Sequence, residues 1–342
     1  MKTILVTLIW LLGFGTSCSQ SEETVRKLSD TGQTRSYARI FGDDGDYEIR
    51  PPAYTKLDDT GKVLPDDAGQ WAMVRDDVTG LVWEVKTEED GVRNRNRRFT
   101  WYNADAAANG GHAGLAGDGT DTQDYIDALN GSNFGGVSGW RLPTVKELST
   151  IVNSGRHNPA IFSDYFPQTV PDNYWTSTPD VTNRNYAWLV NFDTGLVPYG
   201  FNKTDSYYVR AVYGARDGFS PDLKARGDGT VIDRATGLMW QRATVEADRW
   251  DSAISYCETL VLANHDDWRL PNRNELQSLV DYAKTDPSID ESAFPDTLAS
   301  YYWTSTTYAP GPSRSWVVSF HSGYVHFSNK SMAHPFRAVR GP

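Results

Sequence analysis

The sequence has 342 residues, a length that suits two domains, and 39% of them are hydrophobic. Its 12 tryptophans and 18 tyrosines supply enough apolar surface for sizeable buried cores. The formal net charge of −11 repels a phosphate backbone, so the composition argues against nucleic acid as a partner. Only two cysteines are present, and Cys18 falls in a predicted signal, so Cys257 has no disulfide partner.

Residues 1–18 predict an export signal. Lys2 gives a positive start, and residues 4–14 form an apolar stretch that is too short for a permanent membrane span. Small residues then precede Cys18, as in bacterial lipoprotein signals, in which this cysteine is lipidated. We therefore expect lipidation at Cys18 and a membrane-anchored protein at the outer membrane or cell surface. An ordinary secretory signal is the alternative.

Residues 19–70 are polar and rich in Asp, Gly and Ser, which predicts a tether or lead-in ahead of the folded part. Within and just after this segment, residues 33–41 and 71–76 are more apolar and are candidates for edge strands.

Two strings, WRLPTVKEL at 140–148 and WRLPNRNEL at 268–276, lie 128 positions apart. Continuing at that offset aligns FPQT with FPDT and YWTST with YWTST, and VRAV then meets FRAV after one dropped residue. This density of matches indicates an internal duplication, with copies at residues 71–215 and 216–342. The first copy also carries an insertion at residues 109–136.

The leaner second copy predicts these elements in chain order. Residues 230–233 and 237–241 resemble a strand pair, and the apolar stripe from Trp250 to Val261 indicates an amphipathic helix. A second helix begins after Asn272, with Glu275 completing a capping box. Alternating strands then close the copy over 315–320, 324–328 and 335–340. Each copy is therefore an α+β unit of two helices on a small, mainly antiparallel sheet.

The repeated strings have a structural interpretation. Trp140 and Trp268 are expected to be buried anchors between the two helices. The planar guanidinium groups of Arg141 and Arg269 are expected to hold loop carbonyls or a carboxylate. A catalytic Arg–Glu pair is the weaker alternative, because helix capping and core packing already explain these residues.

The motifs TGLxW, WRLPTxxEL, YWTST, AWxVxFxxG and the closing VRAV resemble the Lcl C-terminal domain family, named for a bacterial collagen-like adhesin. The resemblance covers both copies, and DTGQT at 30–34 resembles a lead-in found in such proteins. It implies a C-type-lectin-like fold, export and a binding role. The chain lacks Gly-X-Y repeats and is acidic, so the resemblance does not extend to sulfated glycosaminoglycan as the ligand.

Candidate metal ligands lie in the insertion. Asp118, Asp121 and Asp124 recur at a spacing of three and are candidates for a structural calcium site, although the loop does not match an EF-hand. The alternative is that Asp121 caps a helix over 122–130. Three of the six histidines occur late in the second copy, but they have no histidine counterparts in the first.

Candidate ligand-binding residues lie in two loops that differ fully between the copies, at 179–186 and 307–314. Loops held between matched strands are free to specialise. The predicted contacts are Asn183, Arg184, Asn185 and Tyr186 in the first copy, and Tyr308 and Arg314 in the second.

Together these features predict an exported, lipid-anchored, non-enzymatic protein that binds an extracellular or envelope glycan or protein. Apart from the structural calcium, we expect no cofactor. Two alternatives stay open: a cell-envelope metal-dependent hydrolase that uses the acidic insertion or the late histidines, and a purely structural envelope component.

Overall fold

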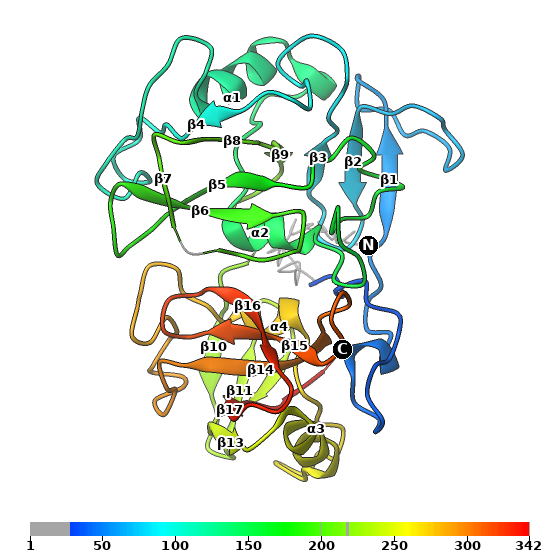
Figure 1. The fold of residues 1–342 in the computed structure, drawn as a ribbon, viewed down its shortest axis with the longest axis vertical. Helices are drawn as coiled ribbons and strands as arrows, with labels where there is room; N and C mark the ends of the chain where they lie inside the picture. Colours follow the sequence, from blue (N-terminus) through cyan, green and yellow to red (C-terminus); the bar gives the residue numbers. More distant parts are fainter. Residues whose placement is uncertain (1–27, 199, 217–218, 342) are drawn as a thin grey trace, which may run out of the picture.

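The computed structural model describes residues 28–198, 200–216 and 219–341 (Figure 1). They form two α+β units that follow each other along the longest axis, so the predicted class and tandem arrangement are confirmed. Cys18 lies outside the described residues, and its lipidation stays a prediction. No helix in the described ranges is long and apolar enough to cross a membrane.

The first unit contains two helices, α1 (Thr122–Gly131) and α2 (Val145–Thr150), and a 3-10 turn, η2 (Phe134–Gly136). Its strands are β1 (Tyr54–Leu57), β2 (Met73–Asp76), β3 (Val82–Glu84), β4 (Phe99–Thr100), β5 (Asn173–Pro179), β6 (Tyr186–Asn191), β7 (Phe201–Asn202), β8 (Ser206–Tyr207) and β9 (Val212–Tyr213).

The second unit repeats this order with helices α3 (Trp250–Thr259) and α4 (Arg273–Ser278). Its strands are β10 (Leu223–Ala225), β11 (Thr230–Asp233), β12 (Met239–Gln241), β13 (Val245–Ala247), β14 (Tyr301–Thr307), β15 (Arg314–Ser319), β16 (Val325–Asn329), β17 (His334–Phe336) and β18 (Val339–Arg340). A 3-10 turn, η1 (Asp44–Asp46), precedes both units.

Each unit divides its strands among three small sheets rather than the one sheet that the sequence predicted. The first unit has the orders β1-β2-β3-β9, β5-β6-β7 and β4-β8, and the second has β10-β11-β12-β18, β14-β15-β16 and β13-β17. Every pairing between these strands is antiparallel. The strands in these sheets are short, with two to seven residues each.

The duplication extends to the strand register. Trp83 opposes Val212 in the first unit, and Trp240 opposes Val339 in the second. The indole nitrogen of Trp101 donates to the Thr176 carbonyl, and that of Trp250 donates to the Thr304 carbonyl, both at 2.8 Å. The units differ in where the first helix begins. In the second unit α3 begins at Trp250, whereas in the first unit α1 begins later, within the insertion.

The two units meet across an approximate two-fold axis. The amides of Val197 and Val325 exchange hydrogen bonds of 3.1 and 3.2 Å, and these residues are 128 positions apart. Ser149 and Gln277, also 128 positions apart, share a hydrogen bond of 3.1 Å between α2 and α4. One hydrophobic cluster draws buried residues from both units. The copies therefore associate through equivalent surfaces, like the protomers of a two-fold dimer.

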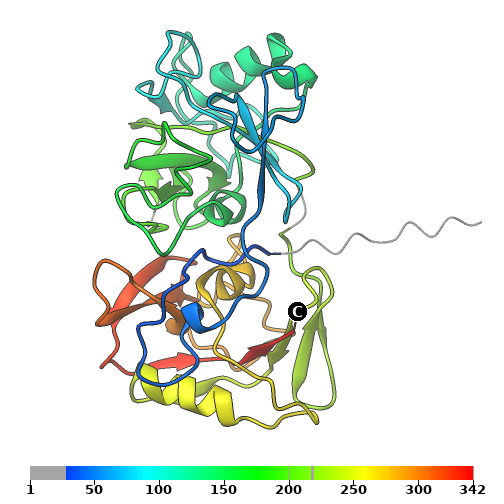
Figure 2. The same ribbon diagram turned by 90° about the vertical axis from the view of Figure 1, so that its right-hand side faces the viewer.

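The predicted tether is not formed over the part of residues 19–70 that the structure describes. Residues 28–50, here called the strap, lie along the second unit in blue (Figure 2). Asp43 and Asp44 in the strap are almost fully buried. Farther on, β1 pairs with β2 and completes a sheet of the first unit. The polar side chains of the strap find hydrogen-bond partners on folded units, so polarity alone did not indicate a free segment.

Replacement of Val197 by Asp tests the junction. Val197 is fully buried, so a carboxylate at this position loses its hydration, and we expect the free energy of unfolding to fall by about 3 kcal/mol or more in guanidinium titrations. Val181→Asp is the matched control, because Val181 is 53% exposed and should change stability by about 0.5 kcal/mol or less. Equal free energies of unfolding for the two variants would contradict the burial of Val197 between the two units.

Candidate functional site

The repeated Arg and Glu residues form a buried pair in each unit. Arg269 binds both carboxylate oxygens of Glu275 at 2.6 Å, and Arg141 binds those of Glu147 at 2.6 and 2.8 Å. Each carboxylate also accepts the amide of the residue that caps the following helix, at 2.9 and 2.7 Å. The pair thus fixes the start of α4 and of α2, which confirms the structural interpretation of the two strings. Trp140 and Trp268 are buried as predicted.

A second repeated pair joins a lysine to a tryptophan. The Lys203 ammonium lies 4.2 Å from the Trp101 ring centre, and that of Lys330 lies 3.5 Å from the Trp250 ring centre. Lys203 also donates to three backbone carbonyls, one of which belongs to Arg184. Desolvation lowers the pKa of each lysine to about 8. These lysines hold loops in place rather than presenting a charge to solvent.

The predicted ligand loop of the first unit is a turn between β5 and β6. Arg184 and Asn185 are exposed, whereas Asn183 and Tyr186 are half-buried. Asn183 supports the turn itself, because its side-chain oxygen accepts the Asn185 amide at 3.0 Å and its carbonyl accepts the Tyr186 amide at 2.8 Å. Arg184 and Asn185 therefore stay available for contacts.

The corresponding loop of the second unit differs from the expectation. Tyr308 is buried and stacks on Phe327 with ring centres 4.1 Å apart, so it belongs to the core rather than to an exposed stacking surface. Arg314 is half-buried, with its guanidinium 4.9 Å from the Phe327 ring centre. Sequence reasoning could not foresee this burial, because part of the surrounding cluster comes from the other unit.

The predicted calcium site is not formed. The two carboxylate oxygens of Asp121 accept three backbone amides, and two of these amides lie at the start of α1. One carboxylate oxygen of Asp124 accepts three backbone amides of the preceding loop. Asp121 is the N-cap of α1, as the alternative interpretation proposed, and Asp118 is exposed. Across the described ranges, no group of three or more His, Cys, Asp or Glu side chains is arranged to hold a metal ion.

The late histidines have separate partners. His321 pairs with Asp286, His326 bonds the Phe327 carbonyl at 2.7 Å, and His334 bonds the Ser328 hydroxyl at 2.7 Å. Cys257 is fully buried, and burial raises the pKa of its thiol, which keeps it protonated and unreactive. These groups do not converge on one site.

A cavity with a volume of about 790 Å³ lies at the junction of the two units. We call it the junction cleft. It is bordered by the start of α2, the end of β5 and residues 279–284 of the second unit. Lys146 crosses this boundary, because its ammonium donates to the Ser278 carbonyl at 2.7 Å, and desolvation lowers its pKa to about 8. This cleft could not be predicted from the sequence, because residues of both units line it.

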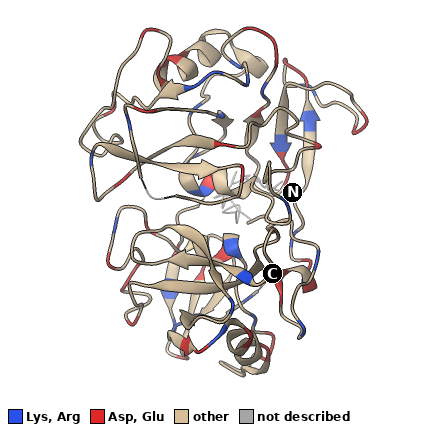
Figure 3. Cartoon of the chain, in the orientation of Figure 1, with Lys and Arg blue, Asp and Glu red and all other residues tan. Residues whose placement is uncertain are grey.

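A smaller cavity of about 280 Å³, here called the arginine cleft, lies next to α1. Arg141, Ser177 and Asp127 line it, and Arg216 borders both this cleft and the junction cleft. Arg141 therefore borders an opening, but both of its carboxylate contacts go to the buried Glu147. Lys and Arg residues alternate with Asp and Glu residues along the chain in both units (Figure 3).

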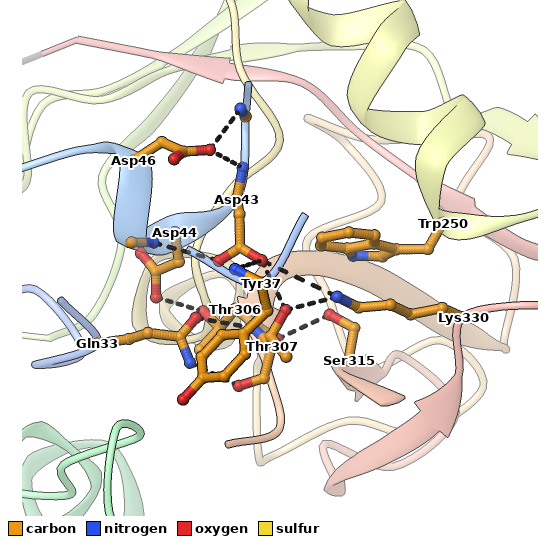
Figure 4. A network of polar contacts seen from close by, with 12 residues as sticks. Gln33, Tyr37, Asp43, Asp44, Asp46, Trp250, Thr306, Thr307, Ser315 and Lys330 are labelled. Carbon is orange, nitrogen blue, oxygen red and sulfur yellow. Dashed lines mark hydrogen bonds and ion pairs between the residues drawn. The ribbon is translucent and has the colours of Figure 1, made fainter. Parts of the chain in front are cut away.

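The strap binds the second unit through a polar network (Figure 4). The Gln33 side-chain amide accepts the Thr307 N–H at 3.0 Å and donates to the Thr307 carbonyl at 2.7 Å, as a neighbouring strand would. Asp44 accepts the Thr306 hydroxyl at 2.8 Å, and Asp43 accepts the Thr307 hydroxyl at 2.7 Å. Two short strings of the sequence supply these strap side chains, DTGQT at residues 30–34 and GDDGD at residues 42–46.

Burial makes the carboxylates of the strap sensitive to pH. Desolvation raises the pKa of Asp30 from 3.8 to about 6, with nearby Glu275 adding to the effect and Arg269 opposing it. Desolvation and then Asp30 also raise the pKa of Asp44. A raised pKa in the folded state favours folding below about pH 4 and loses this contribution as pH rises through 6.

Asp30→Asn should therefore flatten the pH dependence of stability. Between pH 4.5 and 7 we expect the free energy of unfolding of the unchanged protein to fall by on the order of 1 kcal/mol more than that of the variant. Asn keeps the side-chain oxygen that accepts from Thr31 and Asn272. Thermal unfolding at several pH values measures this difference. The exposed Asp118→Asn is the control, and parallel curves for all three proteins would contradict the prediction.

Comparisons with known proteins agree with the internal repeat. A search of curated proteins finds no match to this chain. The family model of the Lcl C-terminal domain matches residues 72–213 and 229–340, and these two segments correspond to the first and second units. The chain therefore belongs to the Lcl C-terminal domain family and carries two tandem copies of its domain.

Proposed function

We propose that this protein is exported, anchored by a lipid at Cys18, and binds an extracellular or envelope partner at the junction cleft without catalysing a reaction. Membership of a surface-associated, adhesin-type family supports the binding role. The observation that carries the proposal is the cleft itself, because it combines apolar walls with Lys146 and Arg216 and needs both units to form.

We further propose that each unit has a C-type-lectin-like fold. Two short helices beside small antiparallel sheets support this assignment. The exposed side chains of Arg184 and Asn185, on the turn that follows Pro179, Asp180 and Val181 of the cleft wall, would extend the binding surface. Either a glycan or a protein could make hydrogen bonds with these groups.

No observation favours the hydrolase alternative. The carboxylates of Asp121 and Asp124 are already occupied by backbone amides, and the late histidines have separate partners. A structural role without a soluble partner is tested by the binding experiment below.

Lipid attachment predicts a simple labelling result. Cys18→Ala should prevent incorporation of a fatty-acid label in the producing bacterium and release the protein from the membrane fraction. Cys257→Ala is the matched control, because Cys257 is the other cysteine in the sequence and is buried. Label on the Cys18→Ala variant, or its full retention on the membrane, would contradict the anchor.

The binding role is tested with the full-length protein in detergent on arrays of glycans and of extracellular and envelope proteins. Ala107→Trp places an indole at an exposed position of the junction cleft and should weaken binding at least about tenfold. Ala299→Trp, exposed and outside the cleft, should bind as the unchanged protein does. A lack of any bound partner would favour the structural role, and unaffected binding by Ala107→Trp would place the site elsewhere.

A further inference from the structure

We propose that the junction cleft and the arginine cleft together bind an extended polypeptide segment of a partner protein, which presents a carboxylate to Thr178. The segment would lie on the first unit as the strap lies on the second. This inference rests on the proposed binding function and specifies the class of partner.

The surface under the strap is repeated on the first unit. Asn272, Thr306 and Thr307 bond the strap, and the residues 128 positions earlier, Thr144, Thr178 and Pro179, line the junction cleft. The two-fold relation also holds for the opposite wall. The Ser154 amide donates to the Thr31 carbonyl of the strap at 2.8 Å, and the equivalent residue of the second unit, Tyr282, lines the junction cleft.

The arginine cleft continues the same path. On the second unit, Tyr47 of the strap lies over Arg269, 5.7 Å from guanidinium to ring centre, and its hydroxyl donates to Glu258 on α3 at 2.5 Å. On the first unit, the equivalent Arg141 borders the arginine cleft beside α1. Arg216 borders both clefts, so the two clefts are adjacent. A bound segment would pass from one cleft into the other, as the strap passes along the second unit.

Within the described ranges the strap covers only one of the two equivalent surfaces. On the first unit Gly110 of the insertion lies against Pro179, while Thr144 and Thr178 line the junction cleft. Ala53 directly precedes β1, and Asp222 directly precedes β10, so the two residues occupy equivalent positions in the two units. The carbonyl of each accepts a backbone amide at 2.9 Å from the residue after the neighbouring strand, which is β2 in the first unit and β11 in the second. The strap precedes Ala53. The end of the first unit precedes Asp222, because β9 ends at Tyr213. Tandem duplication therefore left the second copy without a strap of its own, and the existing strap crosses to the second unit.

The open surface presents groups that match a polypeptide. Thr178 accepts the Val145 amide at 3.1 Å, just as Thr306 accepts the Arg273 amide at 2.9 Å. The Thr306 hydroxyl donates a hydrogen bond to Asp44, whereas the Thr178 hydroxyl has no acceptor among the described residues. In those same ranges the Tyr282 amide also lacks an acceptor, although its counterpart Ser154 donates to a strap carbonyl. A carboxylate and a backbone carbonyl would satisfy these two donors.

The two surfaces differ at positions that set the specificity. Pro179 of the first unit replaces Thr307 of the second. Gln33 bonds both the N–H and the carbonyl of Thr307, but proline has no N–H, so a partner segment can bond only the carbonyl of Pro179. Ala283 replaces Gly155, at which an added Cβ would lie 3.0 Å from the Gly32 carbonyl oxygen of the strap, so a partner segment must lie slightly farther from Ala283. The partner segment is therefore related to the strap in its main-chain course and carboxylate, and it does not need a glutamine at the position of Gln33.

A labelled peptide tests the inference directly. The probe is a fluorescein-labelled peptide with the sequence of residues 28–47, and fluorescence anisotropy measures its binding to the full-length protein in detergent. We expect saturable binding that Ala283→Trp weakens at least about tenfold, because the indole occupies the cleft, and that Thr178→Val weakens about fivefold, because one hydrogen bond is lost. Ala299→Trp should leave binding unchanged.

Thr306→Val is the matched control for Thr178→Val, because both variants lose the same bond to the start of a helix. We expect it to leave probe binding unchanged, since its surface is covered by the strap. Three results would overturn the inference: no saturable binding, loss of binding in Thr306→Val but not in Thr178→Val, or crosslinking of a photoreactive residue at 283 to the chain's own residues 19–27. Array binding that Ala107→Trp weakens, together with any of these results, leaves the proposed function intact and removes only the polypeptide class.

Discussion

The structure depends on one constraint: two copies of a domain associate through equivalent surfaces across an approximate two-fold axis. The amide pair between Val197 and Val325 lies on this axis, and α2 packs on α4 beside it. Because the surfaces are self-complementary, a single set of apolar positions builds both sides of the contact. The shared hydrophobic cluster joins the two units into one body, and the junction cleft exists only because of that contact.

Within each unit, buried charged side chains fix loops and the starts of helices. Glu147 and Glu275 each bind an arginine guanidinium and the amide of a helix-capping residue. Each glutamate therefore links the planar guanidinium to the start of a helix, and both groups are held in place. Lys203 and Lys330 similarly pair with tryptophan rings and loop acceptors. These arrangements give the repeated tryptophan, arginine and glutamate residues structural roles, which explains their fixed spacing in both copies.

Asymmetry enters through the strap. A tandem chain has two equivalent surfaces but one N-terminal lead-in, and the strap covers the surface on the second unit with Gln33, Asp43 and Asp44. The first unit keeps the insertion and the open clefts instead. The strap therefore covers the surface on the second unit, and the equivalent surface on the first unit borders the junction cleft.

The sequence by itself determined the duplication, the α+β class, the helix caps at Thr144 and Asn272, and the burial of Trp140 and Trp268, because all of these depend on short-range patterns that both copies repeat. Only the tertiary structure decided that each unit splits into three sheets, that Tyr308 is a core residue, and that the polar lead-in is packed. These outcomes depend on contacts between residues far apart in the chain, and a carboxylate in a strap has the same local sequence whether it meets water or a buried threonine.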